Sequence, residues 1–201
     1  VLADFMLYNE DKYYKDIKGR RNNPKGSMQV VEEVKKNRDF YNFTANPVPR
    51  SQAYAVLEYI KGQQCVAFYE DYSTKKILLR NGVRNLEARQ DPHYPLLAWN
   101  EKGNKLLVVY NTEGKIRMFT YDIFSRLKRD KLVLDQFEQI QDVKYMLDDN
   151  TLLMSAVRNG QSDIYTFKID RERIEQITND KYDDLDPTFV AFPNKSGILY
   201  A

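Results

Sequence analysis

Residues 176–201 read QITNDKYDDLDPTFVAFPNKSGILYA, and this stretch decides the fold of the chain. A short strand leads into the acidic connection DDLD at 183–186 and then reaches Pro187. A proline can open a strand without removing a ladder hydrogen bond. Two apolar strands follow, separated by a polar turn predicted at 193–197, where asparagine and glycine favour turn backbone angles. The stretch therefore predicts a strand, a connection and a β-hairpin.

The same hairpin occurs twice upstream, at 96–110 and at 143–154. The second strands of these hairpins keep register, because Leu152 follows Leu106 by 46 residues and Ile198 follows Leu152 by 46 residues. Short strands that repeat at this period are typical of a β-propeller, in which each blade is one four-stranded sheet. The fold class predicted is therefore all-β, a β-propeller segment.

The predicted third strands of three blades share an ending, FYED at 68–71, FTYD at 119–122 and FKID at 167–170. Strand alternation would place the three phenylalanines on one face, and each aspartate would begin a turn that its side chain closes. On the predicted inner strands, we expect Trp99, Tyr145 and Phe189 to be equivalent and to fill the core between blades.

The repeat predicts three blades and the start of a fourth, with blades at 29–90, 91–139 and 140–185. Apolar residues at helical spacing predict an N-terminal helix, so residues 1–28 are interpreted as the helical tail of an upstream domain plus a linker. A helix packed beside the propeller is the alternative. Residues 29–201 are interpreted as a partial propeller.

A propeller closes because each blade edge meets a neighbour. Ala201 falls inside a predicted strand, so we expect the chain to be a segment of a larger protein. The remaining blades of the same chain, or a partner, would then complete the ring.

The composition supports a folded domain, since 42% of the 201 residues are hydrophobic and 13% are aromatic. The 31 basic and 29 acidic side chains give a net charge of +2, which provides no reason to expect nucleic acid or an anionic membrane as partner. No apolar run is long enough to predict a transmembrane segment. Cys65 is the only cysteine, which excludes an internal disulfide and a cysteine-based metal site.

Two motifs suggest a family: RNGQSDIY at 158–165 and QITNDKYDDLDP at 176–187. They resemble the repeat of TolB-like propellers, which also occurs in tricorn-type and prolyl-oligopeptidase-type peptidases. They are similar above all to large Gram-negative envelope proteins in which a helical, peptidase-like region precedes the propeller. The resemblance covers 29–201 and implies a periplasmic or outer-membrane-associated location. The first blade departs from the pattern at 46–49, which reads NPVP.

His93 is the only histidine, which removes most metal sites and the usual base for nucleophilic catalysis. It precedes a predicted inner strand, so it is either a ligand contact at the channel mouth or a loop histidine with a local hydrogen bond. Ser155 lies within a strand and no serine has the setting of a nucleophile elbow. We therefore predict no catalytic residue, no metal and no cofactor, and expect these residues to hydrolyse neither peptides nor esters.

The candidate binding residues lie in the connections between blades. They are Arg84, Arg89, Asp91, His93, Asp183, Asp184 and Asp186. The arginines could bind an acidic partner and the aspartates a cation, although solvated surface turns explain both groups. The spacing of the aspartates fits no established calcium loop.

Three functions agree with this pattern. The first is a non-catalytic scaffold that binds a protein or peptide. The second is the substrate-gating propeller of a peptidase whose catalytic residues lie elsewhere. The third is a structural subunit of an envelope secretion or motility assembly.

Overall fold

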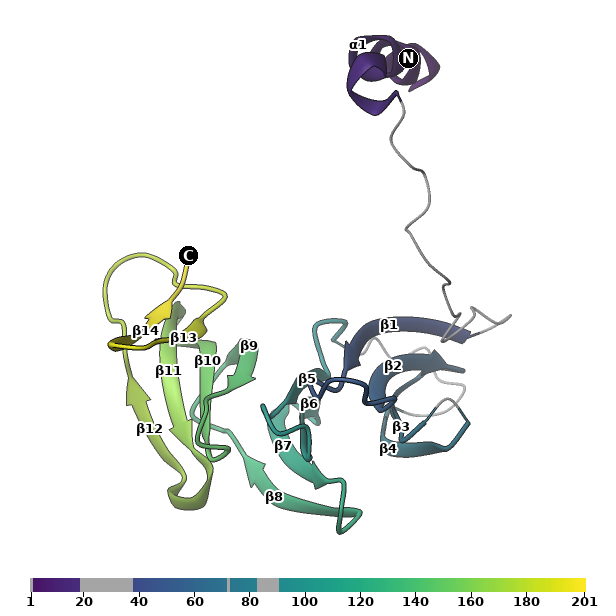
Figure 1. Ribbon diagram of the computed structural model, residues 1–201. Coiled ribbons are helices and arrows are strands. Elements are labelled where there is room, and N and C mark those ends of the chain that lie inside the picture. Colours follow the sequence, from purple (N-terminus) through teal and green to yellow (C-terminus); the bar gives the residue numbers. More distant parts are fainter. Residues whose placement is uncertain (1, 19–37, 72, 83–90) are drawn as a thin grey trace. The chain divides into compact units, whose positions relative to one another are not determined.

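The computed structural model describes residues 2–18, 38–71, 73–82 and 91–201. The predicted N-terminal helix is confirmed as α1 (Leu2–Ile17), which belongs to one compact unit, whereas all the strands belong to a second (Figure 1). The strand predicted at 29–34, and the boundary predicted between residues 28 and 29, lie outside the described residues. Within the described part of the chain, no helix is long and apolar enough to cross a membrane.

The strands form successive antiparallel sheets, which we number as blades. Blade one contains β1 (Arg38–Ala45), β2 (Tyr54–Ile60), β3 (Gln63–Tyr69) and β4 (Lys75–Asn81). Blade two contains β5 (Leu96–Trp99), β6 (Lys105–Thr112), β7 (Lys115–Asp122) and β8 (Leu127–Val133). Blade three contains β9 (Gln139–Tyr145), β10 (Thr151–Arg158), β11 (Gln161–Lys168) and β12 (Arg173–Gln176). Blade four contains β13 (Thr188–Phe192) and β14 (Lys195–Leu199).

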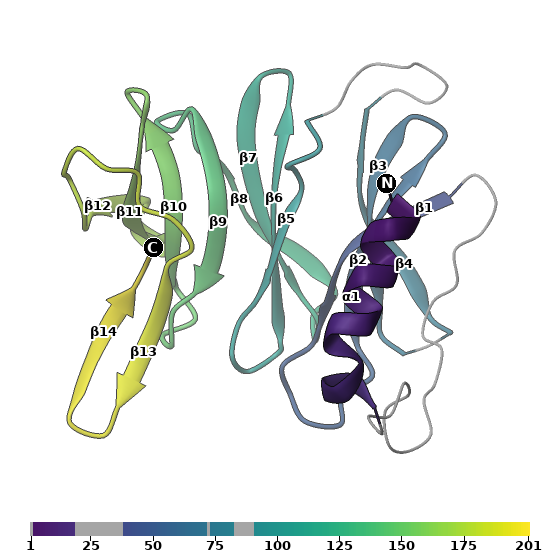
Figure 2. The same cartoon turned by 90° about the horizontal axis from the view of Figure 1, so that it is seen from above.

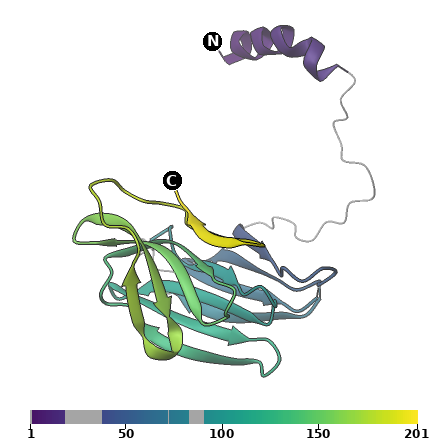
Figure 3. The same ribbon diagram turned by 60° about the vertical axis from the view of Figure 1, so that its left-hand side comes forward.

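Every sheet is a meander in which each strand pairs with its neighbours in sequence. Figure 2 shows the sheets of the second unit following one another in chain order, and Figure 3 shows the same succession from the side, with blade four in yellow. The only other helix in the described ranges is a short 3-10 turn, η1 (Ile169–Arg171). The predicted all-β propeller segment, with three blades and the start of a fourth, is therefore confirmed.

The 46-residue register is confirmed by the pairing of the first two strands of each blade. Trp99 pairs with Leu106, and Tyr145 pairs with Leu152. In blade four, Phe189 pairs with Ile198. The three aromatic residues therefore occupy equivalent positions, as the sequence predicts.

The predicted turn at 193–197 is wrong in length. Phe192 pairs with Lys195, so the turn contains only Pro193 and Asn194. Gly197 instead lies within β14 and pairs with Val190. Proline presets the backbone angle φ of the first loop residue in a tight turn, which favours a short loop at Pro193 and Asn194.

The register inferred from the third strands is also wrong. The hairpins before β3, β7 and β11 show the true equivalence, because Lys115 lies 52 residues after Gln63 and Gln161 lies 46 residues after Lys115. The phenylalanine motifs are instead 51 and 48 residues apart. The first of these spacings differs from the true one by one residue, which moves the side chain to the opposite face of the strand. The second differs by two residues, which keeps the side chain on the same face.

As a result, the three phenylalanines do not share one face. Phe68 pairs with Ala55, and both pack against blade two. Phe119 points from blade two toward blade one, and Phe167 points from blade three toward blade two. The equivalent of Phe167 is Tyr121, since they pair with Leu152 and Leu106 respectively.

The turn-closing role of the aspartates holds for two of the three motifs. The Asp71 carboxylate accepts hydrogen bonds from the backbone N–H of Thr74 and Ser73, which lower its pKa to about 2. Asp122 likewise accepts from the backbone N–H of Ser125 at 2.7 Å. Asp170 lies in η1 and instead accepts from the side chain of Asn150 at 2.8 Å.

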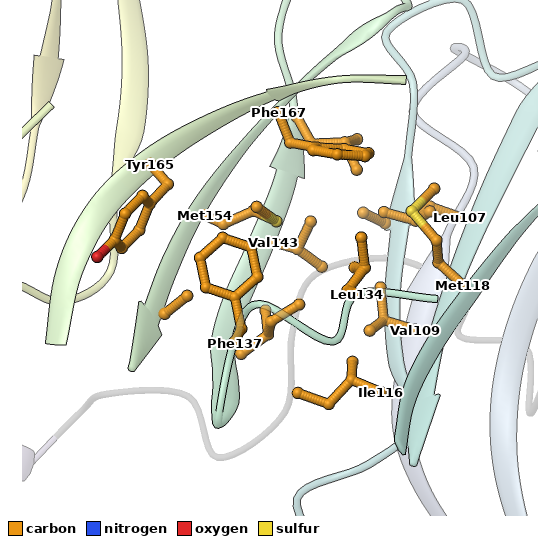
Figure 4. Close-up of a cluster of buried hydrophobic side chains, with 14 of the residues drawn as sticks. Leu107, Val109, Ile116, Met118, Leu134, Phe137, Val143, Met154, Tyr165 and Phe167 are labelled. Atoms are coloured by element: carbon orange, nitrogen blue, oxygen red, sulfur yellow. The ribbon is translucent and has the colours of Figure 1, made fainter. Parts of the chain in front are cut away.

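Two hydrophobic clusters join the blades. One fills the space between blades one and two, where Trp99 lies 6.2 Å from Phe68 between ring centroids. The other lies between blades two and three, where the connection after β8 inserts Leu134 and Phe137 (Figure 4). Tyr145 packs against this second cluster. Trp99 and Tyr145 therefore pack against the cores between blades as predicted, whereas Phe189 belongs to neither cluster; all three side chains are partly buried.

Polar side chains link the first hairpins of adjacent blades. The Asn46 amide donates to the Gly103 carbonyl at 2.7 Å, which joins blade one to blade two. The Asn100 amide donates to the Asp149 carboxylate at 2.9 Å, which joins blade two to blade three. Asn46 and Asn100 occupy equivalent positions, because each begins the turn that follows the innermost strand. We call this set of contacts the interblade belt.

Candidate binding face

The five predicted binding residues that the structure describes belong to one end of the blades. In an antiparallel meander, the fourth strand ends where the hairpin between the second and third strands lies. The connections between blades therefore share this end with three hairpins, at 60–63, 112–115 and 158–161. We call this end the connector face. Of the predicted residues, Arg84 and Arg89 lie outside the described residues.

The connections are fastened to the third strands at repeated positions. In blade one, Gln63 donates to the Gly82 carbonyl and Gln64 donates to the Asp91 carbonyl, both at 3.0 Å. In blade three, the equivalent Gln161 donates to the Tyr182 carbonyl at 3.2 Å. The first residues of the third strand therefore fix the path of the connection that crosses them.

Backbone hydrogen bonds repeat in the same place. The N–H of Leu134 donates to the Ile116 carbonyl at 2.9 Å, and the N–H of Asp184 donates to the Ser162 carbonyl at 2.9 Å. Ile116 and Ser162 are 46 residues apart, so the repeat extends beyond the strands into the connections. Backbone hydrogen bonds therefore hold these connections to the blades.

His93 joins blade two to blade three. Its backbone N–H donates to the Asp91 carboxylate at 2.9 Å, and its imidazole Nε2 lies 2.9 Å from the Ile140 carbonyl, to which a protonated Nε2 donates. The ring also meets Tyr94 edge-on, with centroids 5.2 Å apart. The backbone N–H and the imidazole of His93 are thus both engaged in local contacts just before β5.

Tyr94 makes a second contact to the same residue. Its hydroxyl oxygen accepts from the backbone N–H of Ile140 at 2.8 Å, next to an irregularity in the β9–β10 pairing. Burial raises the pKa of Tyr94 to about 12. The phenol therefore satisfies a backbone donor inside the core between blades two and three.

Tyr94→Phe is expected to lower the free energy of unfolding by about 1–2 kcal/mol, because it leaves the buried Ile140 N–H unpaired. The matched control is Tyr145→Phe, which removes a buried hydroxyl that has no hydrogen-bond partner among the described residues. That change should be neutral or stabilise by up to about 1 kcal/mol. Urea unfolding of both variants measures the contrast, and an equal loss in both would contradict it.

The three predicted aspartates do not converge on one point. The Asp183 carboxylate accepts from the backbone N–H of Ser162 at 3.0 Å, which fastens the connection to β11. Asp184 is buried, and its Oδ2 has no hydrogen-bond partner within the described ranges, whereas Asp186 is exposed at a φ of 50°. Among the described residues, no group of histidine, cysteine or acidic side chains is arranged to hold a metal ion.

A polar pocket of about 350 Å³ lies beside this connection in blade three. It is lined by Arg158, Asn159, Gln161, Asp163, Tyr165, Gln176 and Asn179. The Asp163 carboxylate accepts from the Gln176 amide at 2.9 Å and from the Thr178 hydroxyl at 3.4 Å. Burial raises the pKa of Asp163, which is one of the few buried carboxylates in the second unit.

Figure 4 shows the ring of Tyr165 at the edge of the core, with its hydroxyl directed away from the other labelled side chains. The pocket thus combines a guanidinium, a carboxylate, a phenol and several amides. None of its lining residues is among the predicted binding residues. The run at 158–165 contributes five of the seven lining residues, but from the sequence it indicated only a family.

The chain was compared with known proteins. No family model matches it, and no curated protein matches it. Among solved structures, TolB from Acinetobacter baumannii is similar at a TM-score of 0.58 and 14% identity, over 80% of this chain and 37% of TolB. The β-propeller domain of the Trilobed protease from Pyrococcus furiosus is similar at a TM-score of 0.55 and 10% identity, over 81% and 48% of the two chains.

A prolyl endopeptidase is similar at a TM-score of 0.57 and 9% identity, over 90% of this chain and 28% of that one. This chain therefore spans less than half the length of each of these three solved proteins. At these identities, the likeness shows the fold: the sheets are β-propeller blades of the kind found in TolB and in peptidase propeller domains.

Proposed function

We propose that this chain is a non-catalytic scaffold within a larger cell-envelope protein, and that its connector face binds a protein or peptide. The observation that carries the proposal is the fastening of the connections at equivalent positions, by Gln63 and Gln64 in blade one and by Gln161 in blade three. Loops held in one conformation lose little entropy when they bind, so they suit recognition. The polar pocket beside Asp163 supplies hydrogen-bonding groups for specificity.

The same proposal assigns residues 1–28 to an upstream helical segment and 29–201 to the propeller. It also includes a periplasmic or outer-membrane-associated location, which is supported by the motifs that resemble those of TolB-like proteins and by the likeness to the TolB fold. The remaining blades would come from the same polypeptide or from a partner. On the connector face, Asp91, His93 and Asp183 shape the loops, and Arg158 contributes an exposed charge.

A second candidate function is the gating propeller of a larger peptidase. It is favoured by the likeness to the propeller domain of the Trilobed protease and to a prolyl endopeptidase. In that case the connector face would meet the catalytic domain, and the reacting groups would lie outside these residues.

Selection of a displayed peptide library on the purified chain tests the scaffold proposal. Peptides that bind the connector face should lose at least about tenfold in affinity with Arg158→Glu, because the loss of a charge-assisted hydrogen bond costs at least about 1.4 kcal/mol. The control is Arg171→Glu, which makes the same change on an exposed arginine of η1, at the opposite end of blade three. A selection in which no peptide loses affinity with Arg158→Glu, or in which the same peptides lose as much with Arg171→Glu, would contradict the connector face as a binding surface.

A further inference from the structure

A second surface has the character of a binding groove. It is an open pocket of about 300 Å³ that reaches from blade one to the outer strands of blade two. Its apolar lining comes from Leu79, Tyr110, Met118, Phe119, Leu132 and Val133. Its charged lining comes from Arg117, Lys128 and Lys131, and no acidic residue lines it among the residues that the structure describes. We call it the cationic groove.

Strand β8 has the sequence LKRDKLV and contributes Lys128 and Lys131 to the groove. Its pairing with β7 contains an irregularity that sets the direction of these side chains. Met118 pairs with Leu132 and Thr120 pairs with Arg129, so Asp130 and Lys131 both stand opposite Phe119. Such a bulge changes the direction of side chains along a strand. Asp130 has a φ of 48°, and its carboxylate accepts a hydrogen bond from the Thr120 hydroxyl.

Thr120 lies on the face of β7 opposite to Phe119, because side chains alternate along a strand. The one acidic residue of β8 is therefore engaged on the other side of the sheet. The bulge thus leaves Lys128 and Lys131 in the groove without a neighbouring carboxylate from their own strand.

The positive charge in the groove is poorly neutralised. Among the described residues, no carboxylate forms an ion pair with Lys128 or Lys131. The ammonium of Lys128 instead lies 5.0 Å from the centre of the Phe119 ring, and burial together with the charges of Lys131 and Lys76 lowers its pKa. Arg117 has only a 3.9 Å contact with Glu113, and its buried Nε has no hydrogen-bond partner in the described part of the chain.

The edge of the sheet beside the groove is also available. Within the described residues β8 pairs only with β7, so half of its backbone groups are directed away from the sheet. An extended peptide can bind such an edge through main-chain hydrogen bonds, while alternate side chains enter adjoining pockets. This edge favours a peptide over a small anionic molecule.

We infer that the cationic groove binds an extended acidic peptide segment of a protein partner. Carboxylates of the peptide would pair with Lys128, Lys131 and Arg117, and an aliphatic side chain two residues from a carboxylate would pack on Phe119 and Val133. The inference deepens the proposed function and rests on it, since it adds a second recognition surface with a stated partner chemistry. The observations that support it are the charge complementarity of the groove with an acidic peptide and the free edge of β8.

The test uses two fluorescently labelled, acetylated peptides, Glu-Thr-Leu-Thr-Glu and its counterpart Gln-Thr-Leu-Thr-Gln. In both peptides the first, third and fifth side chains share one face of the extended chain. Fluorescence anisotropy should show the acidic peptide binding at least about tenfold more tightly at 50 mM salt, with the advantage falling at 500 mM as the charges are screened. Equal affinities for the two peptides would overturn the inference.

The double variant Lys128→Gln/Lys131→Gln should abolish the preference for the acidic peptide. Lys195→Gln, a change at an exposed lysine of β14, should leave the preference intact. Circular dichroism would confirm that each variant is folded. A preference that survives the double variant, or that Lys195→Gln also removes, would overturn the inference.

Arg158→Glu separates this inference from the proposed function. It should leave binding of the acidic peptide unchanged, because Arg158 lines the other pocket. If the acidic peptide fails to bind while library-selected peptides still depend on Arg158, only the inference about the groove is wrong. If neither kind of peptide binds, both proposals are wrong.

Discussion

Gly103→Ala should lower the free energy of unfolding by about 3 kcal/mol. The backbone at Gly103 has a φ of 63°, a left-handed conformation that costs a side-chain-bearing residue about 1–2 kcal/mol. A Cβ there would also lie 2.2 Å from Asn46 Oδ1 and 2.7 Å from Val48 Cγ2. Overpacking of this kind typically costs about 1–3 kcal/mol, and relief would require Asn46 to give up its 2.7 Å hydrogen bond to the Gly103 carbonyl.

Thermal unfolding measures the effect, which corresponds to a fall in melting temperature of about 6–12 °C for a domain of this size. Gly114→Ala is the matched control, because Gly114 has a φ of 72° but no atom within 4 Å of the added Cβ. It should lose only the backbone part, about 1 kcal/mol. Gly197→Ala, at an open position without a positive φ, should change the free energy of unfolding by less than about 0.5 kcal/mol. Similar losses at Gly103 and Gly114 would contradict a close contact between the two hairpins.

The repeat could be recognised from the sequence because each hairpin is a local structure. Leu106, Leu152 and Ile198 pair with the aromatic residues that the spacing predicts, since both partners lie within ten residues of one another. Length changes in distant loops leave such a register intact. The inner strands were therefore predicted well.

The third strands show where this reasoning fails. The FYED, FTYD and FKID motifs look alike, yet Phe68 points to the following blade and Phe119 to the preceding one. Similar motifs can begin at different distances from the hairpin before the strand, and a difference of one residue in that distance exchanges the two faces of the strand. Counting from the paired residues Ile60 and Gln63 would have avoided the error, had the hairpin been placed first.

The candidate binding residues were predicted by their place in the connections, and the structure describes the local contacts of five of the seven. Their functional role stays a prediction. Asp91 and Asp183 bind backbone N–H groups, a short-range role that acidic turn residues suggest. The fastening by Gln63 and Gln161 could not be predicted, because it joins groups about 19 to 21 residues apart across the blade. The cationic groove depends on a strand irregularity that no sequence pattern reveals.

The interblade belt depends most strongly on one side chain. Asn100 is fully buried, and its Oδ1 accepts from the backbone N–H of Asn104 at 3.0 Å and of Lys105 at 2.8 Å. Its amide donates to the Asn104 side chain at 2.6 Å and to Asp149 Oδ1 at 2.9 Å. All four hydrogen-bonding positions of the amide are therefore used. The sequence predicts a turn at this residue, but not its contact with blade three.

Asn100→Ala should lower the free energy of unfolding by about 3–4 kcal/mol, because two loop N–H groups and part of the Asp149 carboxylate lose their partner. Urea unfolding measures the loss, which should be the same at pH 5 and pH 7. Burial opposes the ionisation of Asp149, but the hydrogen bond from Lys102 and the charges of Lys102 and Lys105 lower its pKa, and the variant keeps both lysines, so Asp149 should stay charged at both values. A loss below about 1 kcal/mol would mean that the belt contributes little to holding the blades together.

Asn100→Asp should instead give a loss that depends on pH. The new carboxylate keeps the acceptor for the two backbone N–H groups, but it replaces a donor with an oxygen 2.9 Å from Asp149 Oδ1. Burial and the neighbouring negative charge raise the folded-state pKa of the new group above its unfolded value. The charge penalty is then complete at pH 7 and decreases as the pH falls through the raised pKa, since a protonated carboxyl can donate to Asp149. The variant should therefore be more destabilised at pH 7 than at pH 5 by about 1 kcal/mol, whereas Asn100→Ala shows no such difference. If the loss in Asn100→Asp is the same at both pH values, position 100 does not face Asp149 across the blades.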